Sequence, residues 1–256
     1  MHIWHMNGAG NDFMVMDARN GKYDFAALAL KFCKMTGADG FMAVDTAADA
    51  DFRLHFYNSD GSRGEMCGNG ARCICRFAYE NGIAGAQMII QTDAGMVSGQ
   101  RISDTEYRIG MTIPTGLDLQ RKPEIAYVEV GCPHAVKEYT GDLRADAASL
   151  KETMRALRFD PAFPKGANVN FYTWLAEDAV QILTFERGVE DFTLACGTGS
   201  CAVATVLWAQ KKLPSGQLRV ENPGGTLRVS ITGDATGITQ LLLEGPTEIT
   251  KIYHLT

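Results

Sequence analysis

The chain has 256 residues, of which 46% are hydrophobic and 21% charged, and this composition excludes a disordered chain and allows one large core or two smaller ones. The formal net charge is −6, and no basic run is longer than the pair Lys211-Lys212, so nucleic acid and anionic membranes are not expected partners. No stretch approaches the roughly 18 apolar residues that span a bilayer, and the first residues, MHIWHMNG, lack the pattern of an export signal. We therefore expect a cytoplasmic protein whose seven cysteines are reduced.

The first half of the chain contains a predicted strand and a predicted helix on either side of a Cys-Gly-x-Gly motif. In DFRLHFYN (51–58), apolar residues alternate with others as they do in a half-buried strand. The motif itself lies in MCGNGARC (66–73). We expect a helix over 69–80 that ends at Asn81-Gly82, because glycine favours the left-handed conformation after a helix.

The second half of the chain repeats this arrangement. The predicted strand is QILTFER (181–187), and the motif recurs in ACGTGSC (195–201). The expected helix covers 199–212, because its lysines would lie at the negative end of the helix dipole and Pro214 would end it.

The two halves are related by a constant offset in residue number. Cys196 follows Cys67 by 129 positions, and the same offset relates Asp39 to Asn168, Asn58 to Arg187, and Gly95 to Gly224. A repeat of this length indicates a domain duplication, since solenoid units run at roughly 20 to 50 residues. We predict an α/β protein with two similar domains, 1–117 and 118–256, and a last strand over 249–256 that crosses back to the first domain.

Each motif places a cysteine and glycines at the start of a helix. The unpaired N–H groups and the dipole of a helix start favour negative charge, so they can lower the pKa of a thiol and hold a substrate carboxylate. If the two halves face each other, Cys67 and Cys196 could remove a proton from one face of a carbon and return one to the other face. This is an inversion of stereochemistry that needs no cofactor.

Other functions fit the cysteine spacing less well. The pairs Cys67-x5-Cys73 and Cys196-x4-Cys201 lack the Cys-x2-Cys spacing of zinc and redox sites, so no metal is expected. A packing role is expected for the remaining cysteines, which are Cys33, Cys73, Cys75, Cys132 and Cys201. The alternative class is a non-catalytic amino-acid binder or a thiol redox protein, in which alanine at position 67 or 196 would leave function intact.

Several longer motifs, taken in order, resemble the diaminopimelate epimerase family of PLP-independent racemases and epimerases. The motifs are HMNGAGNDF (5–13), NSDGS (58–62), MCGNGARC (66–73), GCPHAV (131–136), ANVNF (167–171), FERGV (185–189), TLACGTG (193–199) and PGG (223–225). The resemblance implies two domains, each a barrel-like, mostly antiparallel sheet around a central helix, with the active site between them. It also implies interconversion of LL- and meso-2,6-diaminoheptanedioate, on the route to lysine and in many bacteria to peptidoglycan.

The resemblance assigns roles residue by residue. It makes Cys67 and Cys196 the acid and base thiols. The N–H donors for the reacting carboxylate would be Gly68, Asn69, Gly197 and Thr198. The reacting end would also be lined by His134 and Glu186, which would contact the ammonium group or tune a thiol. The distal amino-acid end would be held by Asn11, Asn58, Asn168 and Arg187, since the planar fork of arginine suits a carboxylate.

Two positions depart from the pattern of the family. Cys132 stands where many members have asparagine, and EDFT (190–193) replaces the commoner Gly-Glu-Thr, which places Phe192 near the entrance of the expected site. These departures concern the substrate more than the reaction, so the alternative within the fold is a racemase of another amino acid such as histidine or glutamate. The expected partner is a small-molecule substrate, the amino acid diaminopimelate, and a homodimer is an assembly that the sequence leaves open.

Overall fold

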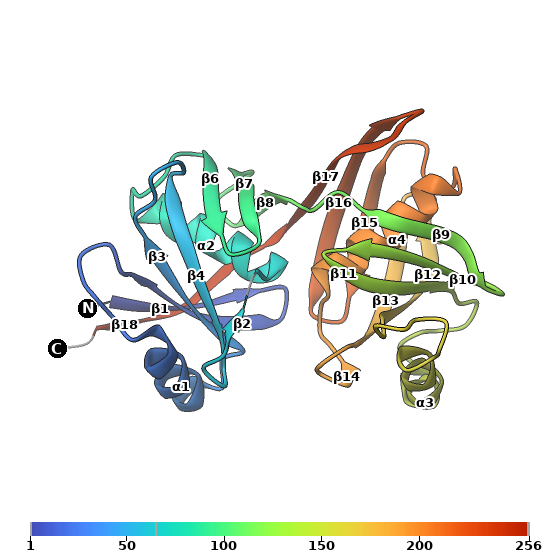
Figure 1. Cartoon of the computed structure of the whole chain (residues 1–256), viewed down its shortest axis with the longest axis horizontal. Helices are drawn as coiled ribbons and strands as arrows, with labels where there is room; N and C mark the ends of the chain where they lie inside the picture. Colours follow the sequence, from blue (N-terminus) through green and yellow to red (C-terminus); the bar gives the residue numbers. More distant parts are fainter. Residues whose placement is uncertain (1, 65, 255–256) are drawn as a thin grey trace. The chain divides into compact units, whose positions relative to one another are not determined.

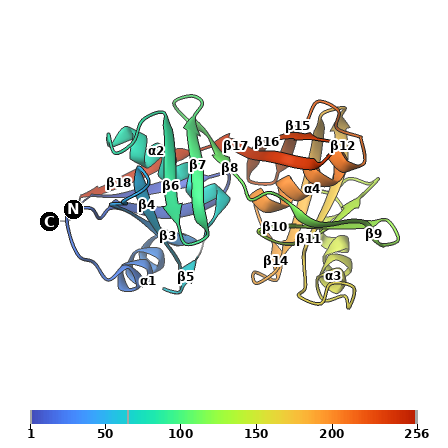
Figure 2. The same cartoon turned by 45° about the horizontal axis from the view of Figure 1, so that its top comes forward.

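The computed structural model describes residues 2–64 and 66–254. The chain forms two compact units, Met1–Gly110 with Glu244–Thr256, and Met111–Leu243. Both units consist mainly of strands with a few helices (Figures 1 and 2), which confirms the predicted α/β class. The change of unit falls at Met111, whereas the sequence analysis places it after residue 117. None of the helices in these described ranges is both long and apolar enough to span a membrane.

The first unit begins with a strand pair and contains two helices in its described residues. Its elements before the long second helix are β1 (His2–Gly8), β2 (Asn11–Asp17), α1 (Phe25–Thr36), β3 (Gly40–Asp45), β4 (Phe52–Asn58) and β5 (Arg63–Gly64). The remainder are α2 (Gly68–Glu80), β6 (Gln87–Thr92), β7 (Gly95–Arg101), β8 (Glu106–Gly110) and β18 (Glu248–His254). The last strand, β18, pairs antiparallel with β1, and residues 255 and 256 of the predicted strand lie outside the described residues.

The second unit repeats the order of elements. Its first elements are β9 (Thr115–Lys122), β10 (Ile125–Val130), β11 (Cys132–Glu138), α3 (Ala147–Arg158), β12 (Asn168–Ala176), β13 (Ala179–Glu186) and β14 (Asp191–Phe192). The others are α4 (Gly197–Ala209), β15 (Gln217–Asn222), β16 (Gly225–Asp234) and β17 (Gly237–Pro246). Strand β17 starts in the second unit and ends in the first.

Strand pairing follows the same sequence of directions in both units. In the first unit, β2–β3 is parallel, β3–β4 antiparallel, β4–β6 parallel and β6–β7 antiparallel. The corresponding pairs β11–β12, β12–β13, β13–β15 and β15–β16 have the same directions. One hairpin differs in register, because Gly40 pairs with Asn58 whereas Val169, 129 positions later, pairs with Phe185 and not with Arg187. The constant offset therefore relates the two cysteines but not every strand residue.

Helices α2 and α4 are each packed against strands of their own unit on several sides. Helix α2 contacts β1, β2, β3, β7 and β8, and α4 contacts β10, β11, β12, β15 and β16 (Figure 1). Both helices have 13 residues, and most of these residues are buried. A helix buried on nearly every side is a core element and not a surface amphipathic helix. The residues at its N-terminus are thereby held in a rigid frame.

The two helices also end in the same way. Gly82 and Lys211 both have a positive φ, 63° and 60°, and the backbone bonds Ile83 N–H to Ala78 O and Lys212 N–H to Leu207 O close a Schellman motif in each unit. The predicted cap at Asn81-Gly82 is confirmed. The predicted helix over 199–212 is wrong at both ends. Gly197 and Thr198 are already helical, and the helix ends at Ala209 because Lys211 takes the left-handed conformation that glycine usually adopts.

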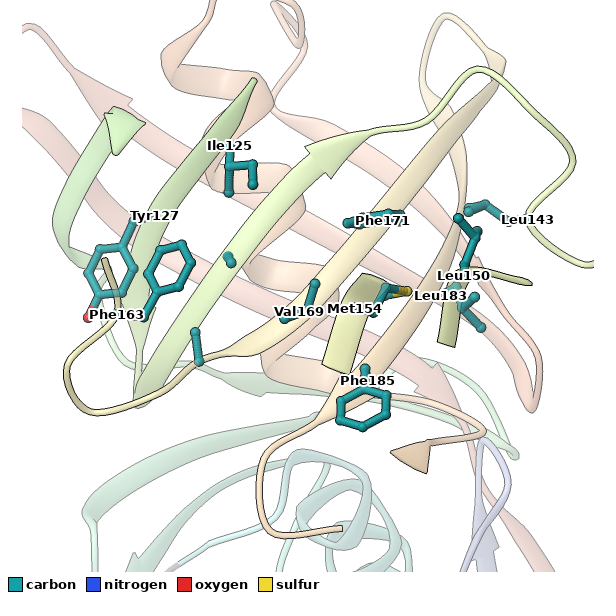
Figure 3. Packing of buried hydrophobic residues seen from close by; sticks show 12 residues of the cluster. Ile125, Tyr127, Leu143, Leu150, Met154, Phe163, Val169, Phe171, Leu183 and Phe185 are labelled. Atoms are coloured by element: carbon teal, nitrogen blue, oxygen red, sulfur yellow. The ribbon is translucent and has the colours of Figure 1, made fainter. Parts of the chain in front are cut away.

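Each unit has a further helix that covers its sheet. Helix α1 packs on β2, β3 and β4, and α3 packs on β12, β13 and β14. In the second unit, Leu150 and Met154 of α3 belong to one cluster with Phe171, Leu183 and Phe185 of the sheet (Figure 3). Burial of each such side chain stabilises the fold by about 1.5–3 kcal/mol. Strand β12, which begins at the predicted site residue Asn168, is contacted by both α3 and α4.

Candidate functional site

Both motif cysteines are the N-cap residues of the central helices. Cys67 has φ −123° and ψ 125°, and Cys196 has φ −117° and ψ 107°, so both are extended. The carbonyl of Cys67 accepts from Ala71 N–H at 2.7 Å, and that of Cys196 accepts from Ser200 N–H at 2.9 Å. The first N–H groups of a helix have no partner inside the helix, so each cysteine lies beside a set of donors. The sequence duplication is thus also a duplication of this local structure.

The two cysteine side chains differ in their surroundings. Cys67 is half-buried and makes no capping hydrogen bond to its helix. The side chain of Cys196 is buried, with 6% of its surface exposed, and its Sγ accepts from Gly199 N–H at 3.3 Å. The hydroxyl of Thr198 lies 3.4 Å from the same sulfur. The duplicated motif therefore gives two cysteines in unequal environments.

The electrostatics of the second unit favour the uncharged form of Cys196. Burial raises the pKa of Cys196, and the nearby Glu186 carboxylate raises it further. The hydrogen bonds from Thr198 and Gly199 act in the opposite direction and lower this pKa. Burial also raises the pKa of Glu186. A thiolate at Cys196 depends on these two donors, because they offset the cost of a buried negative charge.

Cys132 belongs to this polar group. Asn168 Nδ2 donates to its Sγ at 3.3 Å, His134 Nε2 lies 3.3 Å from it, and Thr198 Oγ1 lies 3.9 Å from it. The expectation of a packing role for Cys132 is therefore wrong. His134 lies in the same strand as Cys132, while Asn168 and Thr198 come from β12 and α4, which are remote in the sequence. The other four cysteines with an expected packing role are buried, and burial raises the pKa of Cys33 to about 11 and that of Cys73 to about 12.

His134 is completely buried, with 0% of its surface exposed, and lies behind Cys132. Burial and the positive charge of Arg187 lower the pKa of His134 to about 3, so the imidazole is neutral at neutral pH. The Nδ1 atom of His134 lies 3.1 Å from Nδ2 of Asn170, a buried residue that sequence reasoning missed. The available signal was the alternation of ANVNF, which puts Asn168 and Asn170 on the same face of a strand.

Asn168 and Arg187 meet at the end of β13. Asn168 Oδ1 accepts from the backbone N–H of Arg187 at 2.8 Å, and the guanidinium of Arg187 donates to the carbonyl of Lys165 at 3.0 Å. The side chain of Arg187 is exposed, while Asn168 is buried. The structure thus brings together the predicted residues of the second unit, which are His134, Asn168, Glu186, Arg187, Cys196, Gly197 and Thr198.

In the first unit, the predicted residues Asn11 and Asn69 are hydrogen-bonded to each other. Asn69 Nδ2 donates to Asn11 Oδ1 at 2.6 Å, and Asn11 Nδ2 donates to Asp39 Oδ2 at 3.2 Å. Behind them, the fully buried Arg72 donates to Asn69 Oδ1 at 2.9 Å. Sequence reasoning missed Arg72, because arginine is usually exposed and Arg76 follows in the same helix. Asn58 is exposed, and its Nδ2 donates to Ser62 Oγ at 2.9 Å within the following turn.

A cavity of about 550 Å³ in the second unit lies at the other end of α4. It is lined by Val206, Gln210 and Lys212 at the end of that helix and by Glu138 and Tyr172 of the sheet. Its charged groups are paired, since Lys212 Nζ and Tyr172 OH both donate to Glu138, at 3.0 and 3.1 Å. None of the predicted site residues lines it. Within residues 2–64 and 66–254, no three His, Cys, Asp or Glu side chains are grouped so that they could hold a metal ion.

Two α/β units with the same order of elements, each with a central helix, define a fold that several solved structures share. A phenazine biosynthesis protein of the PhzF family from Bacillus anthracis matches with a TM-score of 0.79 at 15% identity, over 100% of this chain and 99% of that chain. A probable proline racemase from Agrobacterium radiobacter K84 matches with a TM-score of 0.71 at 17% identity, over 100% and 92%. These similarities show the fold.

The family follows from sequence similarity. The family model for diaminopimelate epimerase matches residues 3–114 and 126–247. The diaminopimelate epimerase of Aquifex aeolicus is 36% identical over 84% of this chain and 85% of its own length, and that of Chlorobaculum tepidum is 36% identical over 94% and 96%. The chain belongs to the diaminopimelate epimerase family and is an isomerase.

Proposed function

We propose that this protein interconverts LL- and meso-2,6-diaminoheptanedioate with Cys67 and Cys196 as a pair of acid/base thiols. The observation that carries the proposal is the matched pair of N-cap cysteines, 129 positions apart, each at the start of a 13-residue buried helix. Relatives named diaminopimelate epimerase support the choice of substrate. The product would serve lysine biosynthesis, the role that the family resemblance implies.

In the proposed reaction one cysteine acts as thiolate and the other as thiol. The thiolate takes the α-proton from one face of the carbon, and the thiol gives its proton to the opposite face. The charge that develops at the α-carbon spreads into the substrate carboxylate. N–H groups at the helix starts, from Gly68, Asn69, Gly197 and Thr198, would stabilise that charge. After each turnover the two sulfurs have exchanged protonation states, and the reverse reaction restores them.

Residues beyond the cysteines would select the substrate. A guanidinium has five N–H donors, so Arg187 can hold the Lys165 carbonyl and pair with a distal carboxylate as well. We assign Asn11, Asn58 and Asn168 to the same distal end, and Glu186 to the neighbourhood of the reacting ammonium group. The thiols need a reducing compartment, so we further propose a cytoplasmic location. Gel filtration would show whether the protein forms a homodimer.

Exchange of the α-hydrogen in D2O tests the proposal. The purified protein is incubated separately with diaminopimelate, histidine and glutamate, and deuterium at the α-carbon is followed by NMR. We expect exchange with diaminopimelate alone. The departure at Cys132 favours a second candidate, a racemase of another amino acid, because a thiol there offers Asn168 a sulfur in place of an amide. Exchange with histidine or glutamate but not with diaminopimelate would establish that candidate instead.

A further inference from the structure

The donor and the acceptor of each hydrogen bond around Cys132 can be assigned from neighbouring groups that can only donate or only accept. The chain of contacts begins at the buried Asn170 of β12. Its Nδ2 faces two backbone carbonyls, those of Ala135 at 3.2 Å and Asn168 at 3.3 Å, and its Oδ1 accepts from the hydroxyl of Thr184 at 3.0 Å. Because a carbonyl can only accept, the amide of Asn170 has one orientation.

The orientation of Asn170 fixes the tautomer of His134. The Nδ2 donor of Asn170 also faces His134 Nδ1, at 3.1 Å, so Nδ1 accepts. A neutral imidazole carries a single N–H, which must then be on Nε2. That nitrogen lies 3.3 Å from Cys132 Sγ. His134 therefore donates a hydrogen bond to the sulfur of Cys132.

The sulfur of Cys132 receives a second donor. Asn168 Oδ1 accepts from the backbone of Arg187, so Asn168 Nδ2 is the atom that faces Cys132 Sγ, at 3.3 Å. Two N–H groups thus point at this sulfur. The hydrogen of the Cys132 thiol is left to its remaining partner, the hydroxyl oxygen of Thr198 at 3.9 Å.

The hydroxyl of Thr198 then has its own hydrogen available for Cys196, whose sulfur lies 3.4 Å away. We propose that Cys132 is a positioning residue which, through Thr198, directs a hydrogen bond onto the sulfur of Cys196 and so stabilises the thiolate of that cysteine. The inference deepens the proposed function, because it rests on Cys196 as one of the acid/base thiols. It assigns a role to a cysteine that stands outside the duplicated motif.

The neighbouring charges make such a donor necessary. Burial disfavours negative charge on Cys196 most strongly, and the Glu186 carboxylate from β13 adds to this effect. The positive charge of Arg187 lowers the pKa of Cys132, but burial raises it by more and so keeps Cys132 in the thiol form. The donors that remain for a Cys196 thiolate are the Thr198 hydroxyl and Gly199 N–H. A hydroxyl held in one direction is a better donor than one free to rotate.

The first test is the S–H stretching band of Cys132 in the infrared spectrum, isolated as the difference between wild type and Cys132→Ala. If the thiol donates to Thr198, the band lies at the lower frequency of a hydrogen-bonded thiol, and Thr198→Val moves it to that of a free thiol. Thr198→Ser keeps the hydroxyl and should leave the band in place. A band that does not respond to Thr198→Val would overturn the proposal.

The second test is the rate of alkylation of Cys196 by iodoacetamide at pH 8, followed peptide by peptide with mass spectrometry. Loss of a hydrogen bond to a thiolate raises its pKa by about one unit, so Thr198→Val should be alkylated about tenfold more slowly. In Cys132→Ala, Cys196 should be alkylated about threefold more slowly than in wild type. In Cys132→Ser, whose hydroxyl can still donate to Thr198, the alkylation rate of Cys196 should stay near that of wild type. Cys132→Ala added to Thr198→Val should bring no further slowing, because Cys132 acts only through Thr198.

Cys201→Ala is the matched control, since it removes a buried thiol of the same helix. It should leave the alkylation of Cys196 unchanged. Equal slowing by Cys132→Ala in the wild-type and Thr198→Val backgrounds would overturn the proposal, and so would a wild-type Cys196 that reacts no faster than Cys201. Neither test uses a substrate. The expected alkylation pattern without α-hydrogen exchange of diaminopimelate would contradict the proposed function but support this inference.

Discussion

Arg72 donates from its guanidinium to Oδ1 of Asn69 at 2.9 Å, inside the first turn of the helix that Cys67 caps. From there the hydrogen bonds run through Asn11 to the carboxylate of Asp39. The chain joins a buried positive charge to a negative one and holds both asparagines in one orientation. The arginine thus orients the amides that the family resemblance assigns to substrate binding.

Arg72→Met should therefore destabilise the protein. The variant leaves Oδ1 of Asn69 without its charged donor, and removing one partner of a buried polar pair costs about 2–4 kcal/mol of unfolding free energy. Urea unfolding of wild type and variant measures the difference. Arg63→Gln is the control, because Arg63 forms an ion pair with Asp93 at the surface and should matter little. An Arg72→Met protein as stable as wild type would show that the chain has no structural role.

The buried His134 should make stability depend on pH. Its pKa is about 3 in the folded protein and 6.5 as the ordinary value, so between these values the unfolded chain binds a proton that the folded one excludes. The stability contribution is complete above pH 6.5 and is lost as the pH falls toward 3, by up to about 1.4 kcal/mol per pH unit.

Unfolding free energies of wild type and His134→Gln, measured between pH 7.5 and about 5, check this sign. The wild type should lose stability faster than the variant as the pH falls below 6.5. His2→Gln, at an exposed strand residue, should follow the wild type. Parallel curves for wild type and His134→Gln would mean that the histidine is not kept neutral by the fold.

The left-handed residue after each central helix gives a matched pair of variants. Lys211 has φ 60°, which costs a side-chain-bearing residue about 1 kcal/mol, so Lys211→Gly should raise the unfolding free energy by about 0.5–1 kcal/mol. Gly82 occupies the same position 129 residues earlier, where an added Cβ would meet no atom within 4 Å, and Gly82→Ala should lower stability by a similar amount through its backbone conformation alone. If both variants changed the unfolding free energy in the same direction, the two helices would not share the same left-handed C-terminal cap.

Replacement of either motif cysteine should abolish epimerisation. An acid/base group contributes roughly 10²- to 10⁴-fold to the rate, and the two groups act as a unit, so Cys67→Ala and Cys196→Ala should each lose at least that factor, and the double variant little more. Turnover of diaminopimelate, followed by circular dichroism or coupled assay, gives the rates. Cys33→Ala removes a buried thiol of α1 and should remain active. Near-normal activity in either motif variant would assign the cysteines to binding or structure.

Local sequence features were sufficient for the helices that carry the cysteines, because a glycine-rich turn followed by small apolar residues is a local signal. The end of α4 could not be predicted, since Lys211 takes a conformation usually left to glycine. Central placement of the two helices also required the family resemblance, because α4 has no charged residue to mark an exposed face, and the polar stripe of α2 (Arg72, Arg76 and Glu80) is typical of a surface helix.

The polar neighbours of the cysteines were the least predictable part. Cys132 meets Asn168 and Thr198 at sequence separations of 36 and 66 residues, so only the assembled sheet shows that its sulfur is hydrogen-bonded. Arginine is usually exposed, and no residue within one turn of Arg72 in the sequence indicates that its guanidinium is buried. Such contacts depend on strand order, which local patterns do not specify.

The most direct test of two thiols on opposite faces is the distribution of deuterium at early conversion in D2O. The wild-type protein is given one epimer of diaminopimelate, and the α-hydrogen content of product and of unreacted substrate is measured by mass spectrometry. With separate donor and acceptor thiols, the product carries solvent deuterium while the unreacted substrate keeps its protium. Deuterium entering the substrate as fast as the product, or a product that retains the original α-hydrogen, would mean that one base serves both faces.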